Sequence, residues 1–470
     1  MKKKLLEDAL SQVGDDHIRE AATYKKRRLA PWFGAVAAVL ALAIALGIFW
    51  PGRTKETPPQ ANPGVYTLCA PNYPILSPYP ADEADYEAYT KWADSQKALR
   101  APEGYADSLD GFFDRTLSLL LGKAEGQNKV YSPLSIYLAL AMLAEITGGE
   151  TKAQILALLG AADQAALRTQ ASQVWKAHYH DDGLSTCILG SSLWLSDNYS
   201  YIEQTAQTLA DDYFASVFRG DLGSDEMNEA LRAWLSQQTG GLLDAYIEDI
   251  QMEPLTVLAL ASTVYYQVQW TEAFREENNT QAVFHAPGGD RTETFLNRSS
   301  TTAAYYAPEG FQVTGLYLED RSTMWLFLPE EGTTPEALMA GGQPWAFLTG
   351  EKDPEGVTLN LSLPKFDISA DTDLVEDLKS LGITRVFDST ADFSPLLKEE
   401  DGGYVSQVRH AARVAIDEEG VTAAAYTLIL RDAGSMPPPR EVDLVFDRPF
   451  AFVIQSRDGL VLFAGVVNEP

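Results

Sequence analysis

Cysteine is nearly absent from this chain, since Cys69 and Cys187 are the only two among 470 residues. A disulfide-stapled scaffold and a cysteine-rich zinc site are therefore excluded. One bridge between the two thiols and two free thiols both remain open. At this length the chain needs no staple, because it can bury one large hydrophobic core or several ordinary ones.

Basic side chains are also scarce. The chain has 36 lysine and arginine residues against 66 aspartate and glutamate residues, which gives a formal net charge of −30 at pH 7. A surface of this sign repels phosphates and argues against a nucleic-acid partner. With 46% apolar and 22% charged residues, the composition is typical of a globular protein and not of a disordered or collagen-like chain.

Signatures of catalysis and of metal binding are missing as well. No G-x-S-x-G, H-E-x-x-H, Walker or G-x-G-x-x-G motif occurs, so we expect no catalytic residues, no enzyme activity and no cofactor. The densest histidine cluster is the segment from His178 to Asp182 (HYHDD). It could ligate a metal. It follows a helical pattern and leads into Gly183, however, and this context favours a solvated polar loop.

The longest apolar run lies near the N-terminus. Phe33–Trp50 carries no charge over 18 residues, and as a helix it would span roughly 27 Å, close to the hydrocarbon thickness of a bilayer. The basic residues Lys25–Arg28 precede it, so the positive-inside rule places the N-terminus in the cytoplasm and the rest outside. A single-pass anchor in the cell membrane is favoured over the alternative, a long cleaved signal peptide, because no small-x-small cleavage site follows the run.

Proline concentrates directly after this run. Eight of the 25 prolines lie between residues 51 and 80, and because proline disfavours helix, the stretch is predicted to be an extended tether. We therefore divide the chain into a short cytoplasmic segment (1–31), a transmembrane anchor (32–50), a tether with a leading helix (51–104) and a globular domain (105–470). The anchored topology suggests a bacterial, Gram-positive-like cell surface.

The globular part mixes helical and strand patterns without regular alternation. Helical periodicity is expected in residues 81–121, 134–145, 152–159, 164–178, 201–212, 225–238 and 372–381. Strand-like runs cover residues 188–195, 255–268, 323–328, 357–363, 442–446, 450–454 and 460–467. Helices come first and strands later, which predicts an α+β fold and not a doubly wound sheet.

Residues 418–439 have an unusual order of side chains. A small-residue stretch leads into β-prone Tyr426–Leu430, and the segment ends in Pro437–Pro439. An apolar, strand-competent segment with flexible and proline-rich ends is a candidate for adding itself to a sheet. An ordinary strand with a turn, or a short alanine helix, is the alternative.

Several motifs along residues 105–470 resemble those of the serpin family. They are Asn128–Ile136 (NKVYSPLSI), Asn228–Leu243, the QWTEAF segment with Trp270 and Phe274, Leu326–Pro329 (LFLP), Leu363–Phe366 (LPKF), Leu381–Ile383 (LGI), Asp447–Phe452 (DRPFAF) and Leu462–Gly465 (LFAG). Their shared order and spacing, more than any single motif, carry the resemblance. It implies a serpin fold, with helices packed around three β-sheets and an exposed reactive-centre loop, here preceded by one transmembrane helix.

The resemblance also implies a polar cluster beneath the central sheet. Ser132, Ser135 and His410 match its members, and such buried groups must be hydrogen-bonded. Where the family usually has an asparagine, this chain has Ser262, whose side chain is shorter. Trp270 is implied near the top of the sheet, where the loop first enters.

Residues 418–439 match the family's reactive-centre loop. The hinge of inhibitory members, E-x-G-[T/S]-x-A-A-x, corresponds here to Glu418, Gly420, Val421, Thr422, Ala423, Ala424 and Ala425. Valine stands where threonine or serine is common. Small side chains suit a hinge that must slide between two strands, because bulky or charged groups would block that step. Alternation along a strand puts the side chains of residues 421, 423, 425, 427 and 429 on one face, which could face the core. Arg431 would continue this face and is its only charged residue.

The family's spacing places the reactive bond seventeen residues along from Glu418, counted inclusively, at Gly434–Ser435. Rival bonds are Arg431–Asp432 for a trypsin-like enzyme and Leu430–Arg431 for a chymotrypsin-like one. A small residue before the cut favours an elastase-like or subtilisin-like target.

These features predict an extracellular, membrane-tethered, monomeric inhibitor of serine proteases, with cysteine proteases as a further target class. The resemblance implies a suicide substrate: the target forms an acyl-enzyme with the loop, and loop insertion then traps it. The alternative within the family is a non-inhibitory binding or signalling ectodomain, but such members often carry charged, bulky or proline residues in the hinge. A membrane-anchored hydrolase has no motif support.

Overall fold

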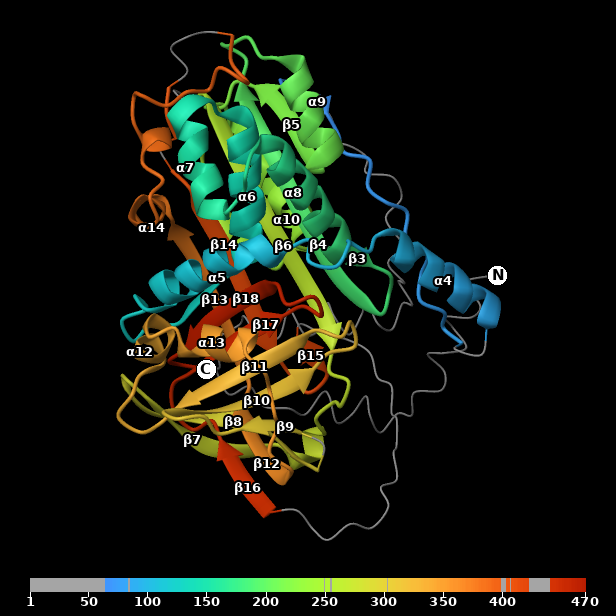
Figure 1. The fold of residues 1–470 in the computed structure, drawn as a ribbon, viewed down its shortest axis with the longest axis vertical. Helices are drawn as coiled ribbons and strands as arrows, with labels where there is room; N and C mark the ends of the chain where they lie inside the picture. Colours follow the sequence, from blue (N-terminus) through green and yellow to red (C-terminus); the bar gives the residue numbers. More distant parts are fainter. Residues whose placement is uncertain are drawn as a thin grey trace, which may run out of the picture. The chain divides into compact units, whose positions relative to one another are not determined.

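A computed structural model describes residues 64–82, 85–248, 250–253, 256–301, 303–398, 403–405, 407–421 and 440–470. The described part combines one large and two smaller sheets with helices that gather mainly around the large sheet (Figure 1). The prediction of an α+β fold with three β-sheets is confirmed.

The described α-helices are short to medium in length, and five of them begin at a residue whose side chain caps the first turn. Asp163, for example, caps α8 by accepting a hydrogen bond from the backbone N–H of Ala166 at 2.8 Å, as expected for an aspartate at this position. They are α4 (Tyr86–Ala98), α5 (Asp110–Thr116), α6 (Pro133–Ile146), α7 (Gly149–Leu159), α8 (Gln164–His178), α9 (Glu203–Asp212), α10 (Asp225–Gln238), α11 (Asp244–Ile247), α12 (Pro335–Ala340), α13 (Gln343–Thr349) and α14 (Val375–Ser380). A π-helical turn, η2 (Leu117–Leu121), continues α5, and short 3-10 turns are η1 (Asp107–Leu109), η3 (Glu276–Asn278) and η4 (Arg385–Phe387).

The largest sheet has eight strands and runs the length of the domain. Its order is β1 (Tyr66–Cys69), β5 (Ala215–Gly220), β4 (Ser185–Ser196), β6 (Leu258–Gln269), β15 (Gly420–Val421), β14 (Arg409–Ile416) and β13 (Phe366–Asp373), with β3 (His180–Asp181) paired to β4. Only β4 and β5 run parallel; the other neighbours are antiparallel.

The two smaller sheets occupy the lower half of the view in Figure 1. The six-stranded sheet has the order β2 (Lys129–Tyr131), β18 (Val461–Val467), β17 (Phe450–Gln455), β11 (Thr323–Pro329), β10 (Phe311–Tyr317) and β9 (Ala304–Tyr306). The four-stranded sheet has the order β16 (Arg440–Val445), β12 (Val357–Pro364), β8 (Gly289–Ser300) and β7 (Thr280–Ala286). In it, β16 and β12 are parallel.

Both faces of the eight-stranded sheet are covered by helices. On one face α6 lies in the main core, and all its residues except Ala139 are buried. On the other face α10 packs with Trp194 and Phe218 into a second apolar cluster, against which Ala259, Ala261 and Ala411 lie half-buried. Neighbouring residues along a strand point to opposite faces of the sheet. Alternate residues of β6 and β14 therefore face α6 on one side of the sheet and α10 on the other.

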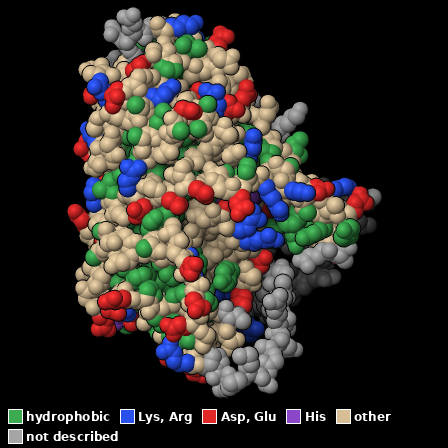
Figure 2. Space-filling model, in the orientation of Figure 1, with side chains coloured by type: hydrophobic (Ala, Val, Ile, Leu, Met, Phe, Trp, Pro, Cys, Tyr) green, Lys and Arg blue, Asp and Glu red, His purple; other side chains and the backbone are tan. Residues whose placement is uncertain are grey.

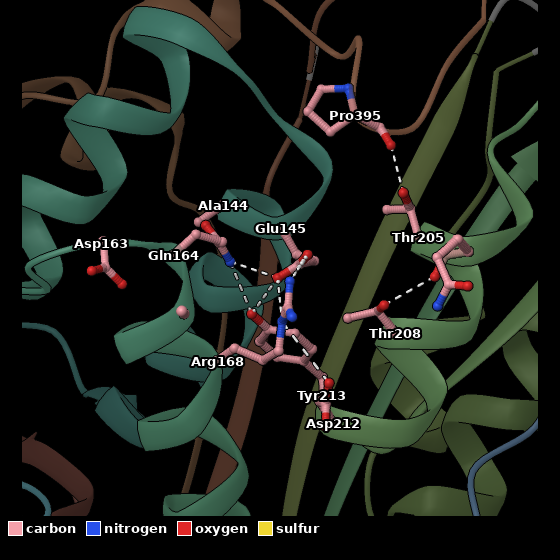
Figure 3. A network of polar contacts seen from close by, with 12 residues as sticks. Ala144, Glu145, Asp163, Gln164, Arg168, Thr205, Thr208, Asp212, Tyr213 and Pro395 are labelled. Atoms are coloured by element: carbon pink, nitrogen blue, oxygen red, sulfur yellow. Dashed lines mark hydrogen bonds and ion pairs between the residues drawn. The ribbon is translucent and has the colours of Figure 1, made fainter.

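A buried carboxylate holds the helices behind the sheet together (Figure 3). Glu145 of α6 is 7% exposed and accepts two hydrogen bonds from Arg168 of α8, at 2.7 and 3.1 Å. Gln164 and Tyr213 donate to the same carboxylate at 2.7 and 2.9 Å. A buried charge is tolerated when it is paired and hydrogen-bonded in this way, so α6, α8 and the end of α9 are fixed to one another.

The segment expected to be a free tether is docked on the domain from residue 64 onward. Its β1 adds an edge strand to β5, and the ring of Tyr73 stacks on Trp175 with centroids 5.4 Å apart. The backbone N–H of Tyr79 donates to the carbonyl of Asp182 at 2.6 Å. From residue 64 to residue 80 the segment is therefore attached along the domain, because its aromatic side chains find partners in the core.

Two further expectations need correction. Residues 81–121 are not one helical stretch, since α4 ends at Ala98 and the next turn begins at Asp107. The helix expected over residues 372–381 starts only at Val375, because β13 occupies Phe366–Asp373. Within the described ranges no helix has the length and apolarity to cross a bilayer, and the expected anchor, Phe33–Trp50, lies outside those ranges.

Candidate functional site: a gap in the central sheet

The eight-stranded sheet is incomplete at its centre. The described part of β15, Gly420 and Val421, pairs with β6 at Gly420–Gln269 and Val421–Val268. On its other side it pairs with β14 at Ile416 alone. Below this point β6 is paired to β4 and β14 is paired to β13, and no pairing joins β6 to β14 within the described residues. Within the described residues, no strand therefore lies between the facing edges of β6 and β14 beyond Val421.

A cavity of about 190 Å³ occupies this position. It is lined from one face of the sheet by Leu140 and Leu143 of α6 and from the other by Leu231 and Leu235 of α10. Residues of both strand edges, among them Leu260 of β6, complete the wall. Because side chains from opposite faces of the sheet meet in one cavity, the opening passes through the sheet.

At the end of β6 next to β15, the first residues of the predicted hinge are tightly packed. Val421 is 2% exposed and lies in the main core. At Gly420 an added Cβ would come within 2.3 Å of the carbonyl oxygen of Val268. No larger residue fits there without moving the strand, which accounts for the glycine of the hinge motif.

Glu418 is held at the entrance by two side chains. The ammonium of Lys365 lies 2.5 Å from its carboxylate, and the amide of Asn279 donates to the same oxygen. Partial burial raises the pKa of Glu418, but the hydrogen bonds from Lys365 and Asn279 outweigh it, so the pKa is lowered overall. The carboxylate is therefore charged and fixed at neutral pH.

Trp270 lies beside the hinge, directly after the last residue of β6. Its indole N–H donates to the carbonyl of Asp417 at 3.0 Å, and its backbone N–H donates to the carbonyl of Glu419 at 2.8 Å. Its ring packs edge-on against Phe274, with centroids 6.3 Å apart. The Asp417 carboxylate in turn accepts from the N–H groups of Glu419 and Gly420, so the turn before the hinge is fixed from two sides.

The polar cluster implied by the resemblance is assembled beneath the gap. The imidazole Nε2 of His410 accepts a hydrogen bond from the backbone N–H of Ser132 at 3.0 Å. Ser132 also caps α6 by accepting from the N–H of Ser135 at 3.1 Å. The Ser135 hydroxyl lies 3.2 Å from both the hydroxyl and the carbonyl of Ser262. The shorter Ser262 side chain thus bonds to Ser135 and not to His410.

Burial lowers the pKa of His410 to about 4. The imidazole is therefore neutral at physiological pH, and its Nε2 is free to accept from Ser132. This network bridges β14, α6 and β6, three of the elements that line the cavity.

The remaining site predictions fall on residues that the structure does not describe. These are Thr422, Ala423, Ala424 and Ala425 of the hinge, and Leu430, Arg431, Gly434 and Ser435 of the candidate reactive bonds. They stay predictions. The sequence reasoning gave no role to Lys365, Asn279 or Asp417; the L-P-K-F motif contains Lys365, but nothing in the motif reveals its partner.

Comparison with known proteins bears directly on this arrangement. The model of the family described as serpin (serine protease inhibitor) matches residues 111–470. The chain belongs to the serpin family. Serpin-ZX from Arabidopsis thaliana is 27% identical over 365 residues, covering 74% of this chain and 93% of that protein.

Solved serpin structures share the fold. The native stressed conformation of AtSerpin1 from Arabidopsis has a TM-score of 0.69 at 25% identity and covers 79% of this chain and 100% of that one. The thermophilic serpin tengpin in the native state has a TM-score of 0.71 at 23% identity and covers 87% of this chain and 100% of that one. The expected serpin fold, with its three sheets, is confirmed. The bacterial source suggested by the sequence is not supported: both Serpin-ZX and AtSerpin1 come from a plant.

The family is described as one of serine protease inhibitors and not of catalysts, which is consistent with the lack of catalytic motifs in the sequence. Two other sequence expectations can now be judged. Both cysteines are free thiols. The cluster from His178 to Asp182 is not a solvated loop: His178 and Asp182 are each only 4% exposed, and the described residues offer no arrangement suited to a metal ion.

Proposed function

We propose that this serpin inhibits a serine-type protease by inserting its cleaved reactive-centre loop into the central sheet. Two observations carry the proposal: beyond Val421 no described strand lies between the facing edges of β6 and β14, and a cavity lies further along these edges, at Leu258–Thr263 and Arg409–Ala411. A strand that enters between these edges gains backbone hydrogen bonds on both sides, and this free energy drives the step.

The register of β15 supports a specific fit for the loop. Continuing Gly420–Gln269 and Val421–Val268 downwards pairs Arg431 with Leu258, the first residue of β6. Residues 420–431 would then match β6 over its whole length. A bond cut after residue 431 leaves this stretch intact, which supports Gly434–Ser435 over Leu430–Arg431.

The same register explains the polar cluster. Thr427 comes opposite Ser262 on β6 and opposite His410 on β14 when the pairs are continued. Its hydroxyl can donate and accept, so it can join both groups in the inserted state. Ala423 and Ala425 come between Tyr266 and Val264 on one side and Val414 and Ala412 on the other, on the core face where small side chains pass without a clash.

The proposal is tested by mixing the full chain with a subtilisin-like, an elastase-like, a trypsin-like and a chymotrypsin-like protease. We expect a complex that survives a denaturing gel with the first or second enzyme, and a released C-terminal peptide that begins at Ser435 in mass spectrometry. A peptide that begins at Asp432 would reassign the target to trypsin-like enzymes. Cleavage without any stable complex would favour a non-inhibitory binding or signalling role.

We also propose that the chain is held at a cell membrane by Phe33–Trp50, with the serpin domain outside the cell. The length of the apolar run and the basic residues before it support this topology. Extraction of cell membranes with alkaline carbonate tests it: an anchored chain stays in the pellet and, in intact cells, its domain is digested by added protease. A soluble chain that begins after Trp50 would instead indicate a cleaved signal peptide.

A further inference from the structure

A second cavity, of about 500 Å³, lies between α4 and the body of the domain. This volume is in the range of small-molecule binding sites. Its walls come from α4, the end of α8 with β3 and β4, the β10–β11 turn and the β17–β18 turn. Helix α4 precedes residue 111, where the match to the family model begins, so one wall is formed by a part of the chain that the family match does not cover.

The wall formed by α4 is fixed to the domain by Asp182. One oxygen of its carboxylate accepts from the indole N–H of Trp92 at 2.7 Å and from the amide of Gln96 at 3.0 Å. The other oxygen accepts from the backbone N–H groups of Leu184 and Ser185, at 3.1 and 3.0 Å. All four acceptor positions of this carboxylate are therefore in use.

The other acidic side chains around the cavity also have donors. Asp320 accepts from the hydroxyl of Tyr266 and from the backbone N–H of Ser322, both at 2.9 Å. Asp458 accepts from Arg457 at 3.2 Å and from the hydroxyl of Tyr105 at 3.5 Å. Glu319, the last of the four acidic residues in the wall, also has an interaction partner. Each acidic side chain of the wall thus already has a partner within the protein, and that of Asp458 includes the cation of Arg457.

Its basic groups are engaged less fully. Arg100 at the end of α4 and Arg321 in the β10–β11 turn line the cavity, are exposed, and have no side-chain hydrogen bond or ion pair with any described residue. In Figure 2, basic side chains gather beside the apolar side chains of the α4 region. Two free guanidinium groups facing one cavity are unusual in a chain whose formal net charge is −30, and guanidinium groups bind carboxylate, sulfonate and phosphate groups well.

The remaining wall is aromatic or uncharged. Trp92, Tyr79 and Tyr89 line the cavity on the α4 side, and Trp92 packs edge-on against Tyr79 with centroids 5.0 Å apart. His178 and His180 line the opposite side, where burial lowers the pKa of both, so neither carries charge at neutral pH. The ring of His180 makes no hydrogen bond to any described residue, and it can donate to or accept from a ligand.

We propose that this cavity binds a small aromatic anion: a planar ring system that packs against Trp92 and Tyr89 and carries one acidic group held by Arg100 and Arg321. The site is independent of the reactive-centre loop, so the proposal does not rest on the inhibitory function. A ring alone leaves the guanidinium groups unused, and a simple anion alone leaves the aromatic wall uncovered.

Isothermal titration calorimetry on the purified full chain tests the proposal with three probes. These are 2-naphthalenesulfonate, the uncharged analogue 2-naphthalenemethanol, and inorganic sulfate. We expect 2-naphthalenesulfonate to bind one site at least tenfold more tightly than either of the others. No saturable binding of the sulfonate, or equal binding of the alcohol, overturns the proposal. Equally tight binding of sulfate overturns its aromatic part.

Two variants locate the site. The double variant Arg100→Gln/Arg321→Gln should weaken binding of the sulfonate at least tenfold and leave binding of the alcohol unchanged, because only the charge contacts are removed. Arg275→Gln, which removes an exposed arginine outside this cavity, is the matched control and should leave both unchanged. If Arg275→Gln weakens the sulfonate as much as the double variant does, the effect is one of net charge and the proposed site is wrong. Since all three arginines are exposed, none of these changes is expected to affect folding.

Discussion

The eight-stranded and the six-stranded sheets of this serpin are built from similar strands but differ in completeness. In the six-stranded sheet β17 pairs with β11 on one side and with β18 on the other, residue by residue. In the eight-stranded sheet, β6 and β14 have no described partner beyond Val421 on the sides that face each other. One chain therefore contains a finished sheet and an unfinished one.

The packing of the two sheets follows the same division. The residues Phe450–Ile454 of β17 are all fully buried, and at Gly465 of β18 an added Cβ would come within 2.5 Å of the ring of Phe452. By contrast, residues Leu258–Ser262 of β6 are all half-buried. The comparison shows that packing is looser at one place in the large sheet, the end of β6 that lies away from the hinge.

Cutting the loop should add a strand to the eight-stranded sheet and so remove its difference from the six-stranded sheet. We expect cleavage between Ala425 and Pro437 to raise the melting temperature by roughly 20 °C or more, because a strand of about ten residues adds hydrogen bonds that contribute about 1 kcal/mol each. Differential scanning calorimetry before and after cleavage measures it, with mass spectrometry to verify the cut. An unchanged midpoint in fully cut protein would rule out insertion.

A charged side chain on the core-facing side of the loop should oppose insertion of the loop into the sheet. Ala423→Arg places a guanidinium group on the core face next to Val414, and its desolvation opposes insertion. The variant should still be cut by the target protease, but the yield of gel-stable complex should fall at least tenfold. Ala424→Arg, on the opposite face, is the control and should reduce trapping less. Undiminished trapping by Ala423→Arg would contradict the hinge assignment.

Truncating one leucine in each sheet sharpens the contrast in packing. Leu326→Ala in β11, where the side chain is fully buried, should lower the free energy of unfolding by about 2–5 kcal/mol. Leu260→Ala in β6 borders an existing cavity, so the loss should be less than about 1.5 kcal/mol. Thermal unfolding of both variants side by side provides the measurement. Equal losses would mean that the gap is as well packed as the finished sheet.

Acid should act on the network beneath the gap. The pKa of His410 is lowered from 6.5 to about 4 by burial, so its contribution to stability is present above pH 6.5 and is lost as the pH falls through 4. At pH 5 the loss amounts to about 2 kcal/mol. His178, whose pKa is also about 4, adds a loss of the same sign. Melting temperatures between pH 7.5 and 5 should therefore fall less steeply for His410→Gln than for the natural chain.

The matched control for this change is His285→Gln. His285 is exposed, and its hydrogen bond to Asp290 raises the pKa, so its removal should not flatten the acid dependence. If His410→Gln leaves the slope of the melting temperature against pH unchanged, the imidazole is not the group that responds.

The sequence indicated the local motifs of this protein better than the contacts between segments that are far apart in the chain. The motifs that run from Asn128 to Gly465 singled out Ser132, Ser135 and His410, and the structure brings these three residues together. The docked segment from residue 64 to α4 was missed, since its attachment depends on pairs far apart in the chain, such as Trp92 with Asp182. The burial of His178 and Asp182 was missed for the same reason: a run of polar residues reads as exposed unless its distant cover is known.

Ser262 and Lys365 show where local patterns stop being informative. The sequence indicated that a serine replaces an asparagine in the cluster, but only the structure reveals that its hydroxyl turns to Ser135. Lys365 stands in a recognisable motif, yet its partner Glu418 lies 53 residues further along. Pairings between charged groups on separate strands are fixed by the sheet register, which no single segment encodes.

The edge strand β1 ties the N-terminal part of the chain to one side of the gap only. It is joined through β5 and β4 to β6, whereas β14 and β13 lie on the far side. Admission of one more strand separates the two sides by about 4.8 Å, the spacing between neighbouring strands. The point at which the chain leaves towards residue 63 shifts by that amount relative to β13. In the proposed insertion, the N-terminal part of the chain that begins at β1 would therefore move together with β6 and relative to β13.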